Sequence, residues 1–422
     1  MKKRFVSLLA CGVLTVSAVA GLTACGDSGL KLTVWGPQAQ QETLKQMVAK
    51  FEEANPETKY DITIGVCGEN NALAEVKKAP SSAADVYAYS NDQIASLVSN
   101  GLAEIGSQSV FCQTVVAENS EDSVEAATFN GKLYGYPYAS DNGCFMYYNK
   151  SILNDEDVKT LEGVIAKCEA AGKKIGWALD DSWYAAGFFF AFGCSYEVTY
   201  DSNGKESSIS CDFDSEGGIK ASKAMAKLAN SSAFAGKGTG DDTIIQNFES
   251  GTYAVAVSGT WNAKNIQRLL GNNYGICKLP TVTIDEGKST EETVQISSFR
   301  GYKMYGVNSH SKNIVEAHKL AQFLSNAEMQ ELRFDNHNIG PTNKTVAELD
   351  KVKTNETLAV LNAQNAFAVE QKSVPSNFWN PLDTYGGYII DKLAVENPTS
   401  DKIYSYQAAL NMIVGQIKNS II

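Results

Sequence analysis

The sequence predicts an α/β protein built from two lobes. Strand-like and helix-like segments alternate over residues 30–99, which is the pattern of parallel strands joined by crossover helices. The chain has 422 residues, of which 44% are hydrophobic, so it is long enough for about two or three domains with a sizeable core. No linker-like stretch separates the halves, and this favours two lobes with several chain crossings over two domains in tandem.

The N-terminal elements follow from the spacing of apolar side chains. Residues 30–35 alternate and are rich in β formers, which predicts a strand. Residues 40–54 carry apolar side chains at helical spacing until an Asn-Pro pair ends the helix. Strand patterns return at 60–66 and 83–89, and a helical pattern follows at 92–99.

The rest of the chain continues with mixed elements. Asn130-Gly131 predicts a hairpin turn within residues 129–135. Further patterns predict strands at 145–148 and 253–257 and helices at 158–171, 217–230, 241–251, 311–324 and 326–334. The polar segment 201–214 predicts a surface hairpin or loop, and 283–293 predicts a charged loop.

Residues 1–24 have the pattern of an export signal. A basic start precedes a short apolar run, which is below the roughly 20 residues that a spanning helix needs. Leu22-Thr23-Ala24-Cys25-Gly26 resembles a bacterial lipobox, in which Cys25 is lipidated and becomes the new N-terminus. A secretory cleavage beside an incidental cysteine is the alternative. We expect residues 25–29 to be a short tether and the protein to lie on the outer face of the cytoplasmic membrane.

Charge and cysteine content exclude several classes of partner. A formal net charge of −12 disfavours nucleic acid and anionic lipid surfaces, which leaves a lipid on Cys25 as the membrane contact. No CxxC pair occurs, so no zinc site, other metal site or cofactor is expected. Apart from Cys11 and Cys25, the cysteines are Cys67, Cys112, Cys144, Cys168, Cys194, Cys211 and Cys277. We expect buried free thiols, although one or two disulfides stay open as an alternative.

Several short stretches carry a resemblance to a known family. They are Lys31-Leu32-Thr33-Val34-Trp35 with 50–52, then 84–87, 130–137 with 147–150, Gly259-Thr260-Trp261, and 301–308 with 311–313. In this order and spacing they resemble the extracellular solute-binding proteins of ABC importers, in the branch that contains the maltodextrin-binding proteins. The resemblance covers almost the whole chain after the signal.

The resemblance implies a type II periplasmic-binding-protein-like fold, with two α/β lobes, a multi-crossing hinge and the ligand in the cleft. On that pattern the chain crosses near 137–141, 277–281 and 325–334. The first lobe is then 30–139 with 279–327, and the second is 140–278 with 328–422. Closure would be a hinge motion favoured by a ligand that touches both lobes. The expected partners are an ABC permease and a sugar, and the expected state is a monomer.

Aromatic residues in the matching stretches are candidate sugar platforms, because flat rings bury the C–H face of a sugar. Trp261 takes the place of a stacking tryptophan of the family, and Trp379 that of a second one. The family's acidic and aromatic stretch in the second lobe matches Asp181, with Trp183 and Tyr184 as the aromatics. Packing in a core is the alternative for each ring.

Polar residues are candidates for binding the sugar hydroxyls. Asp92 matches a first-lobe aspartate, with Tyr89 before it and Gln93 where the family has an arginine. Asp141 and Asn142 follow the first crossing, where the family has one glutamate. The remaining candidates, in the loop after the first strand near an absent family lysine, are Gln38 and Gln40. A solvated loop is the alternative for these polar groups.

The best single interpretation is a lipid-anchored, non-catalytic receptor for maltooligosaccharides. The same fold could instead bind another oligosaccharide or a small solute. A secreted carbohydrate-active hydrolase is the rival from another class. No GxSxG, HExxH or P-loop motif is present, and adjacent carboxylates such as Asp180-Asp181 cannot alone flank a glycosidic bond.

Overall fold

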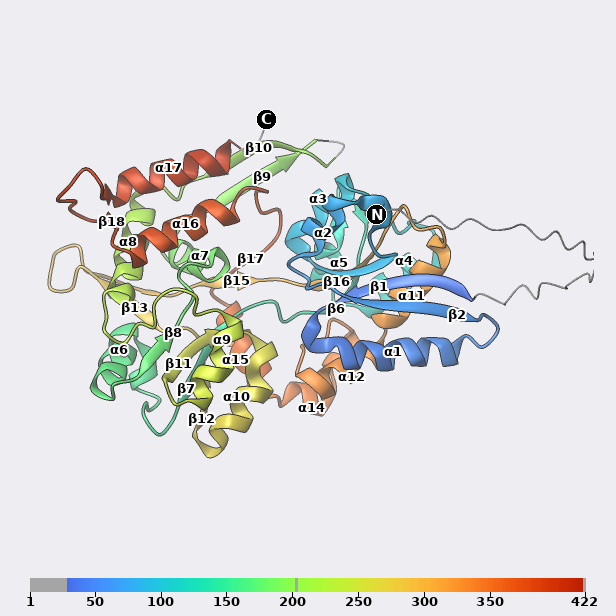
Figure 1. The fold of residues 1–422 in the computed structure, drawn as a ribbon, viewed down its shortest axis with the longest axis horizontal. Helices are drawn as coiled ribbons and strands as arrows, with labels where there is room; N and C mark the ends of the chain where they lie inside the picture. The colour runs from blue at the N-terminus through green and yellow to red at the C-terminus, as the bar shows by residue number, and fades with distance from the viewer. Residues whose placement is uncertain (1–28, 202–203, 420–422) are drawn as a thin grey trace, which may run out of the picture.

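The computed structural model describes residues 29–201 and 204–419, which form two lobes (Figure 1). Each lobe has a central β-sheet covered by helices and its own hydrophobic core. The predicted signal and Cys25 lie outside the described residues. Within those residues, every helix is too short or too polar to span a bilayer.

The first lobe has a five-stranded sheet in the order β2-β1-β3-β16-β6. Its strands are β1 (Leu30–Gly36), β2 (Tyr60–Val66), β3 (Val86–Ser90), β6 (Tyr136–Ala139) and β16 (Lys303–Val307). β1 pairs in parallel with β2 and β3, as the alternating pattern predicts, whereas β16 runs antiparallel to β3 and β6. A strand from late in the sequence therefore completes the N-terminal sheet.

Amphipathic helices cover this sheet. They are α1 (Gln41–Ala54), α2 (Ala72–Lys78), α3 (Ile94–Ser99), α4 (Val110–Glu118), α5 (Glu121–Ala126), α11 (Ile314–Leu324) and α12 (Ala327–His337). In α1 the residues Leu44, Met47, Val48 and Phe51 share one buried face, as their spacing predicts. The short strands β4 (Thr128–Phe129) and β5 (Lys132–Leu133) form the predicted hairpin, with positive φ at both Asn130 and Gly131.

The second lobe has a four-stranded sheet in the order β12-β7-β11-β8. Its strands are β7 (Phe145–Asn149), β8 (Lys174–Gly176), β11 (Tyr253–Ser258) and β12 (Tyr274–Cys277). Its helices are α6 (Leu161–Ala170), α7 (Ser182–Ala191), α8 (Glu216–Ala229), α9 (Asp241–Glu249), α10 (Ala263–Leu270), α15 (Glu356–Asn365), α16 (Trp379–Ile390) and α17 (Tyr406–Lys418). The apolar α7 is buried on nearly all sides, which explains its run of phenylalanines.

Smaller strand pairs and helices complete the described fold. They are β9 (Tyr196–Tyr200) with β10 (Glu206–Cys211), β13 (Thr281–Ile284) with β14 (Glu292–Gln295), β15 (Ser298–Arg300) with β17 (Ala368–Glu370), β18 (Ala394–Val395) with β19 (Tyr404–Ser405), and the helices α13 (Lys344–Ala347) and α14 (Asp350–Lys353). The prediction of a loop at 283–293 was wrong at its ends, because Thr283 pairs with Thr293 and Ile284 with Glu292 in the β13–β14 hairpin.

The chain crosses between the lobes later than the sequence predicts. Residues 140–144 join β6 to β7, near the expected place, but the second crossing is at 301–302, between β15 and β16 (Figure 1). Segment 279–300 lies in the second lobe because Leu279, Val282, Ile284, Ile296 and Phe299 pack in that lobe's core. This corrects the assignment of 279–327 to the first lobe.

The third crossing is also displaced. α12 packs on the first lobe, where Met329 joins the core and the Arg333 guanidinium lies over the rings of Tyr138 and Tyr305. The chain then passes through a small apolar cluster that includes Phe334. α15 enters the second lobe only after that cluster, so the predicted segment 328–422 begins too early.

The seven described cysteines are all free thiols. Five are buried, and Cys112 and Cys277 are half-buried. This agrees with the expectation that they act as small apolar side chains.

Candidate ligand site between the lobes

The seam between the lobes is centred on Gly301, at the second crossing. A Cβ atom at this position would lie 2.7 Å from Asn91 Oδ1 and 3.2 Å from Asn142 Nδ2. Glycine is required because any side chain would displace these amides. Asn91 comes from the first lobe and Asn142 from the first crossing, so parts of both lobes meet at this glycine.

Gln371, which follows β17, joins the two sides of the seam. Its Oε1 accepts hydrogen bonds from Asn142 Nδ2 at 2.9 Å and from Trp183 Nε1 at 2.8 Å. Its backbone N–H donates to the Arg300 carbonyl at 2.7 Å. The Gln371 side chain also hydrogen-bonds Asp92 of the first lobe. One buried amide thereby links Trp183 of the second lobe to Asp92 of the first.

Two half-buried tryptophans lie together on the second-lobe side of the seam. The ring centres of Trp183 and Trp261 are 6.0 Å apart, with an angle of 52° between the planes. Trp183 is in the first turn of α7, where Asp181 Oδ1 accepts from the Trp183 backbone N–H at 2.9 Å and caps the helix. Trp261 lies in the 3-10 turn after β11, with its ring against Gly259.

The loops that carry these rings are held by Asp241, at the start of α9. Its carboxylate accepts from Tyr184 Oη at 3.1 Å, from Ser258 Oγ at 2.5 Å and from Asn262 Nδ2 at 3.1 Å. Tyr184 is next to Trp183 and Asn262 is next to Trp261. The network therefore fixes the separation of the two tryptophans.

A buried ion pair lies beside Trp261. Asp141 is fully buried, accepts a hydrogen bond from Thr260 Oγ1 and lies 3.6 Å from Lys303 Nζ. The same ammonium lies over the Trp261 ring, 4.9 Å from its centre. Burial lowers the pKa of Lys303, but the charges of Asp141 and Glu69 outweigh that effect and leave it raised, so the lysine is protonated at neutral pH.

Two carboxyl groups of the seam have raised pKa values. Burial raises the pKa of Asp92 to about 7, although the hydrogen bond from Gln371 offsets part of the effect. Burial also raises the pKa of Asp181 to about 6; the Trp183 N–H opposes this shift, and the nearby charges of Asp383 and Asp241 add to it. Asp92 is half-buried, whereas Asp181 stays exposed to solvent, which screens the effect of its neighbours, so the raised pKa is the firmer for Asp92.

Three polar atoms at the seam have no hydrogen-bond partner within the described protein: Asn91 Nδ2, Asp92 Oδ1 and Asp141 Oδ1. Buried polar atoms are nearly always paired, and an unpaired one costs about 1–3 kcal/mol. These atoms are suited to bind the hydroxyl groups of a ligand or ordered water.

The structure brings together seven of the twelve predicted ligand residues. Asp92, Asp141, Asn142, Asp181, Trp183, Tyr184 and Trp261 lie at the seam or directly support it. Trp379 packs on Phe299 and Phe378 at the edge of the second-lobe core, which matches the alternative of core packing. Gln38 is exposed and Gln40 half-exposed in the 3-10 turn before α1.

Tyr89 and Gln93 differ from the prediction. Tyr89 is fully buried in the first-lobe core because β3 is a central strand covered on both faces. Gln93 uses its amide to accept from Leu73 N at 2.8 Å and to donate to the Glu69 carbonyl at 2.7 Å. Both side chains support the fold next to Asp92 and Glu69.

Sequence reasoning missed Lys303, Gln371 and Asn91. Asn91 and Gln371 stand outside the stretches that carry the family resemblance, and Lys303 lies within one of them, 301–308, that the sequence does not assign to the ligand site. Each residue reaches the seam through β16, through the end of β17 or through the turn after β3. A weak signal existed for Lys303, since a lysine inside the strand Lys303–Val307 is unusual for a segment buried along its whole length.

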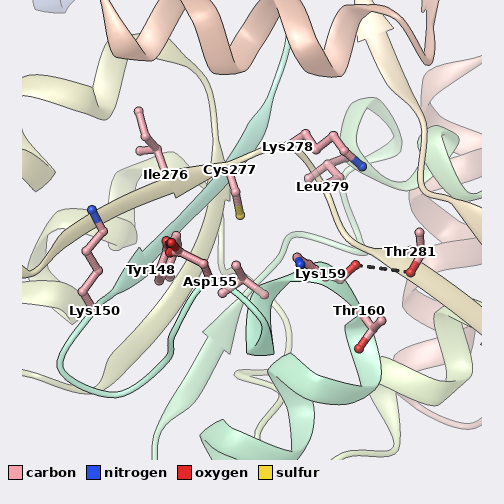
Figure 2. A pocket seen from close by; sticks show the side chains of 11 residues that line it. Tyr148, Lys150, Asp155, Lys159, Thr160, Ile276, Cys277, Lys278, Leu279 and Thr281 are labelled. Carbon is pink, nitrogen blue, oxygen red and sulfur yellow. Dashed lines mark hydrogen bonds between the residues drawn. The ribbon is translucent and has the colours of Figure 1, made fainter.

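Two cavities lie apart from these residues. One, of about 650 Å³, lies on the second lobe between β12 and the start of α6 (Figure 2). Its wall includes Cys277, the Tyr148–Asp155 hydrogen bond of 2.6 Å and the Thr281 hydroxyl, which donates to the Lys159 carbonyl. A ligand bound to one lobe alone cannot favour closure, so we do not place the ligand there.

The other cavity, of about 560 Å³, lies between the β4–β5 hairpin of the first lobe and Tyr200 on the second-lobe hairpin. No group of three or more His, Cys, Asp or Glu side chains in the part of the chain that the structure describes could hold a metal ion.

Comparison with known proteins agrees with this architecture. A family model described as bacterial extracellular solute-binding protein matches residues 46–360. The chain is 26% identical to a galactooligosaccharide-binding protein of Bacillus subtilis (strain 168), over 91% of each chain. It is 25% identical to a maltooligosaccharide ABC transporter solute-binding lipoprotein of Streptococcus pneumoniae (strain ATCC BAA-255 / R6), over 89% of this chain and 86% of the other.

Solved structures share the fold. A maltodextrin-binding protein from L. casei BL23, without ligand, aligns with a TM-score of 0.73 and 25% identity over 93% of this chain and all of that one. A Thermus thermophilus maltotriose-binding protein, bound with maltotriose, aligns with a TM-score of 0.75 over the same share of this chain. At 20% identity the latter supports the fold alone.

Proposed function

Because the chain belongs to the bacterial extracellular solute-binding proteins, we propose that it captures maltooligosaccharides at the seam between its lobes and delivers them to an ABC importer. The family is defined by binding a solute and not by a reaction, so the chain is a binding protein and not an enzyme. The rival interpretation as a hydrolase is therefore excluded.

The observation that carries the proposal is the pair Trp183 and Trp261 beside unpaired buried polar atoms. Two indole rings 6.0 Å apart present flat apolar area to sugar C–H groups. The carboxylates of Asp92 and Asp141 and the amide of Asn91 supply hydrogen-bonding atoms that the protein does not pair. An aromatic surface with a few convergent polar groups is what a carbohydrate requires.

Two ligand classes have support from the relatives. Maltooligosaccharides are favoured by the Streptococcus pneumoniae relative and by the maltodextrin-binding structure from L. casei. A galactooligosaccharide is the second candidate, because the Bacillus subtilis relative that binds one is 26% identical to this chain. Both are neutral sugars with apolar C–H faces and hydroxyl groups, so either class suits an aromatic surface with convergent polar groups.

The proposed location is the outer face of the cytoplasmic membrane, with a lipid on Cys25 as anchor and an ABC permease as partner. The lipobox-like stretch and the lipoprotein relative support this. A Cys25→Ser variant should appear in the culture medium, whereas the wild-type protein should sediment with membranes. Equal release of both proteins would contradict the anchor.

Calorimetry of the protein lacking residues 1–24 tests the ligand. We expect heat of binding with maltotetraose or with a galactotetraose, and none with xylotetraose or glucose. Trp261→Ala should weaken binding by about 1–3 kcal/mol, the value of a lost apolar platform. Tyr404→Ala is the matched control, since it removes a second-lobe ring that is 42% exposed and stacks on Tyr388, away from the seam residues. Unchanged affinity in Trp261→Ala would remove this ring from the site.

A further inference from the structure

Lys303 is a buried cation that crosses the seam. It is the first residue of β16 in the first-lobe sheet, and only 8% of its surface is exposed. Its ammonium lies over Trp261 of the second lobe and 3.6 Å from Asp141 Oδ1. In this way a first-lobe side chain lies against the proposed sugar platform.

The ammonium has fewer hydrogen bonds than a buried cation needs. It carries three N–H donors. Its contact with Asp141 Oδ1, at 3.6 Å, is longer than an ordinary hydrogen bond. Asp141 Oδ1 is itself without a hydrogen-bond partner. A buried charge is costly when its hydrogen bonds are unmade, so this pair favours a ligand that supplies oxygen acceptors and hydroxyl donors.

We propose that Lys303 is a specificity-determining residue that donates hydrogen bonds from the first lobe to the sugar unit stacked on Trp261. This inference rests on the proposed function. A sugar in that position touches the second lobe through its apolar face and the first lobe through its hydroxyls. Stacking and closure are then coupled through one side chain.

The charges around Lys303 restrict the ligand to neutral sugars. The carboxylates of Asp141, Glu69 and Asp241 all act on this ammonium. These carboxylates balance the positive charge of the Lys303 ammonium. An acidic sugar would add a further negative charge beside them, beyond what that one ammonium balances. Lys303 therefore recognises hydroxyl oxygens and not carboxylate groups.

A double-mutant cycle tests the proposal. We expect Lys303→Met to weaken binding of the best oligosaccharide 10- to 100-fold in calorimetry. Affinity in the variant that combines Lys303→Met with Trp261→Ala should fall by at least fivefold less than the product of the two single-variant fold-losses. This is expected because each substitution disrupts the same contact. Lys319→Met, which removes a surface lysine paired with Glu316, is the matched control and should bind as the wild type does.

Further variants separate recognition from folding. Lys303→Met alone leaves the Asp141 carboxylate buried without a cation, which destabilises the fold. The double variant Lys303→Met, Asp141→Asn has no unpaired charge at these two positions, so it should fold. Its affinity for the oligosaccharide should still be lower than that of the wild type. The wild type should not bind an oligosaccharide of uronic acid units, because such a ligand adds charge beside Asp141. Multiplicative effects in the cycle, or wild-type affinity in the neutral double variant, would overturn the role of Lys303. If the wild type bound no oligosaccharide, the proposed function itself would fail.

Discussion

Asp92 gives the seam a pH response. Burial raises the pKa of this carboxyl to about 7, so it is half protonated near neutrality. Sugar hydroxyls donate most strongly to an ionised carboxylate, and binding would therefore favour the charged form. We expect affinity to rise between pH 6 and pH 8, by up to about tenfold for one titrating group. Calorimetry across this range in two buffers of different ionisation enthalpy should detect proton release. Asp92→Asn should bind weakly and should lose most of the rise in affinity between pH 6 and pH 8.

The same carboxyl affects stability in the opposite direction. Its folded-state pKa is above its ordinary value of 3.8, so the folded protein binds more protons than the unfolded chain between about pH 4 and pH 7. The contribution of Asp92 to the free energy of unfolding therefore falls as pH rises through this window. Asp92→Asn should make the denaturant-derived free energy of unfolding less dependent on pH there. An identical slope in both proteins would contradict a raised pKa.

For single residues, the neighbouring sequence predicts a place at the seam in some cases and not in others. The family resemblance predicts Trp183 and Trp261 as ligand residues, and the structure places their rings together at the seam, while their contact with a ligand stays a prediction. The amide of Gln371 could not be predicted, since its partners Asn142 and Trp183 are far from it in sequence. Gln93 is predicted to bind ligand, but its amide instead hydrogen-bonds the backbone of Glu69 and Leu73, which lie in an earlier segment of the chain.

At the scale of elements, the β9–β10 hairpin is a second bridge between the lobes. It extends from the second lobe toward the first (Figure 1). Tyr200 meets Phe129 of the first lobe edge to face, with ring centres 5.2 Å apart, and Asn130 Nδ2 donates to the Asp201 carbonyl at 3.5 Å. Opening of the lobes must break this contact, so the hairpin favours the closed state.

Substitutions at this contact should shift the equilibrium between open and closed lobes, although neither residue is part of the proposed ligand site. Tyr200→Ala and Phe129→Ala should each increase the radius of gyration of the ligand-free protein in solution scattering. Each should also weaken sugar binding by about three- to tenfold, because part of the binding energy must then restore closure. Tyr404→Ala is again the control. Weaker binding without any change in the radius of gyration would mean that Tyr200 contacts the sugar directly.

Across the whole molecule, the two α/β lobes could be predicted but the crossings could not. Strands and helices in residues 30–99 follow local periodicity, which the fold preserves. The positions of the crossings depend on which lobe's hydrophobic core each segment packs in. Val282 and Ile284 alternate with polar residues as a strand of either lobe would, and only the space left in the second-lobe core decides their place.

The interleaved chain predicts that both lobes unfold together. β16 completes the first-lobe sheet although β15, just before it, belongs to the second lobe, and α12 and α15 make a further crossing through a shared apolar cluster. Neither lobe is a continuous segment, so loss of one removes strands or helices that the other needs. Scanning calorimetry should show one cooperative transition.

The proposed ligand should raise the temperature of that single unfolding transition without splitting it. A sugar present at 100 times its dissociation constant stabilises the folded state by about 2.7 kcal/mol if it binds only the folded protein. Because it contacts both lobes, the whole transition should move to higher temperature and stay one peak. Two separated peaks, with only the one for the second lobe moved by the sugar, would show that the ligand binds Trp183 and Trp261 without engaging Asp92 or Lys303 across the seam.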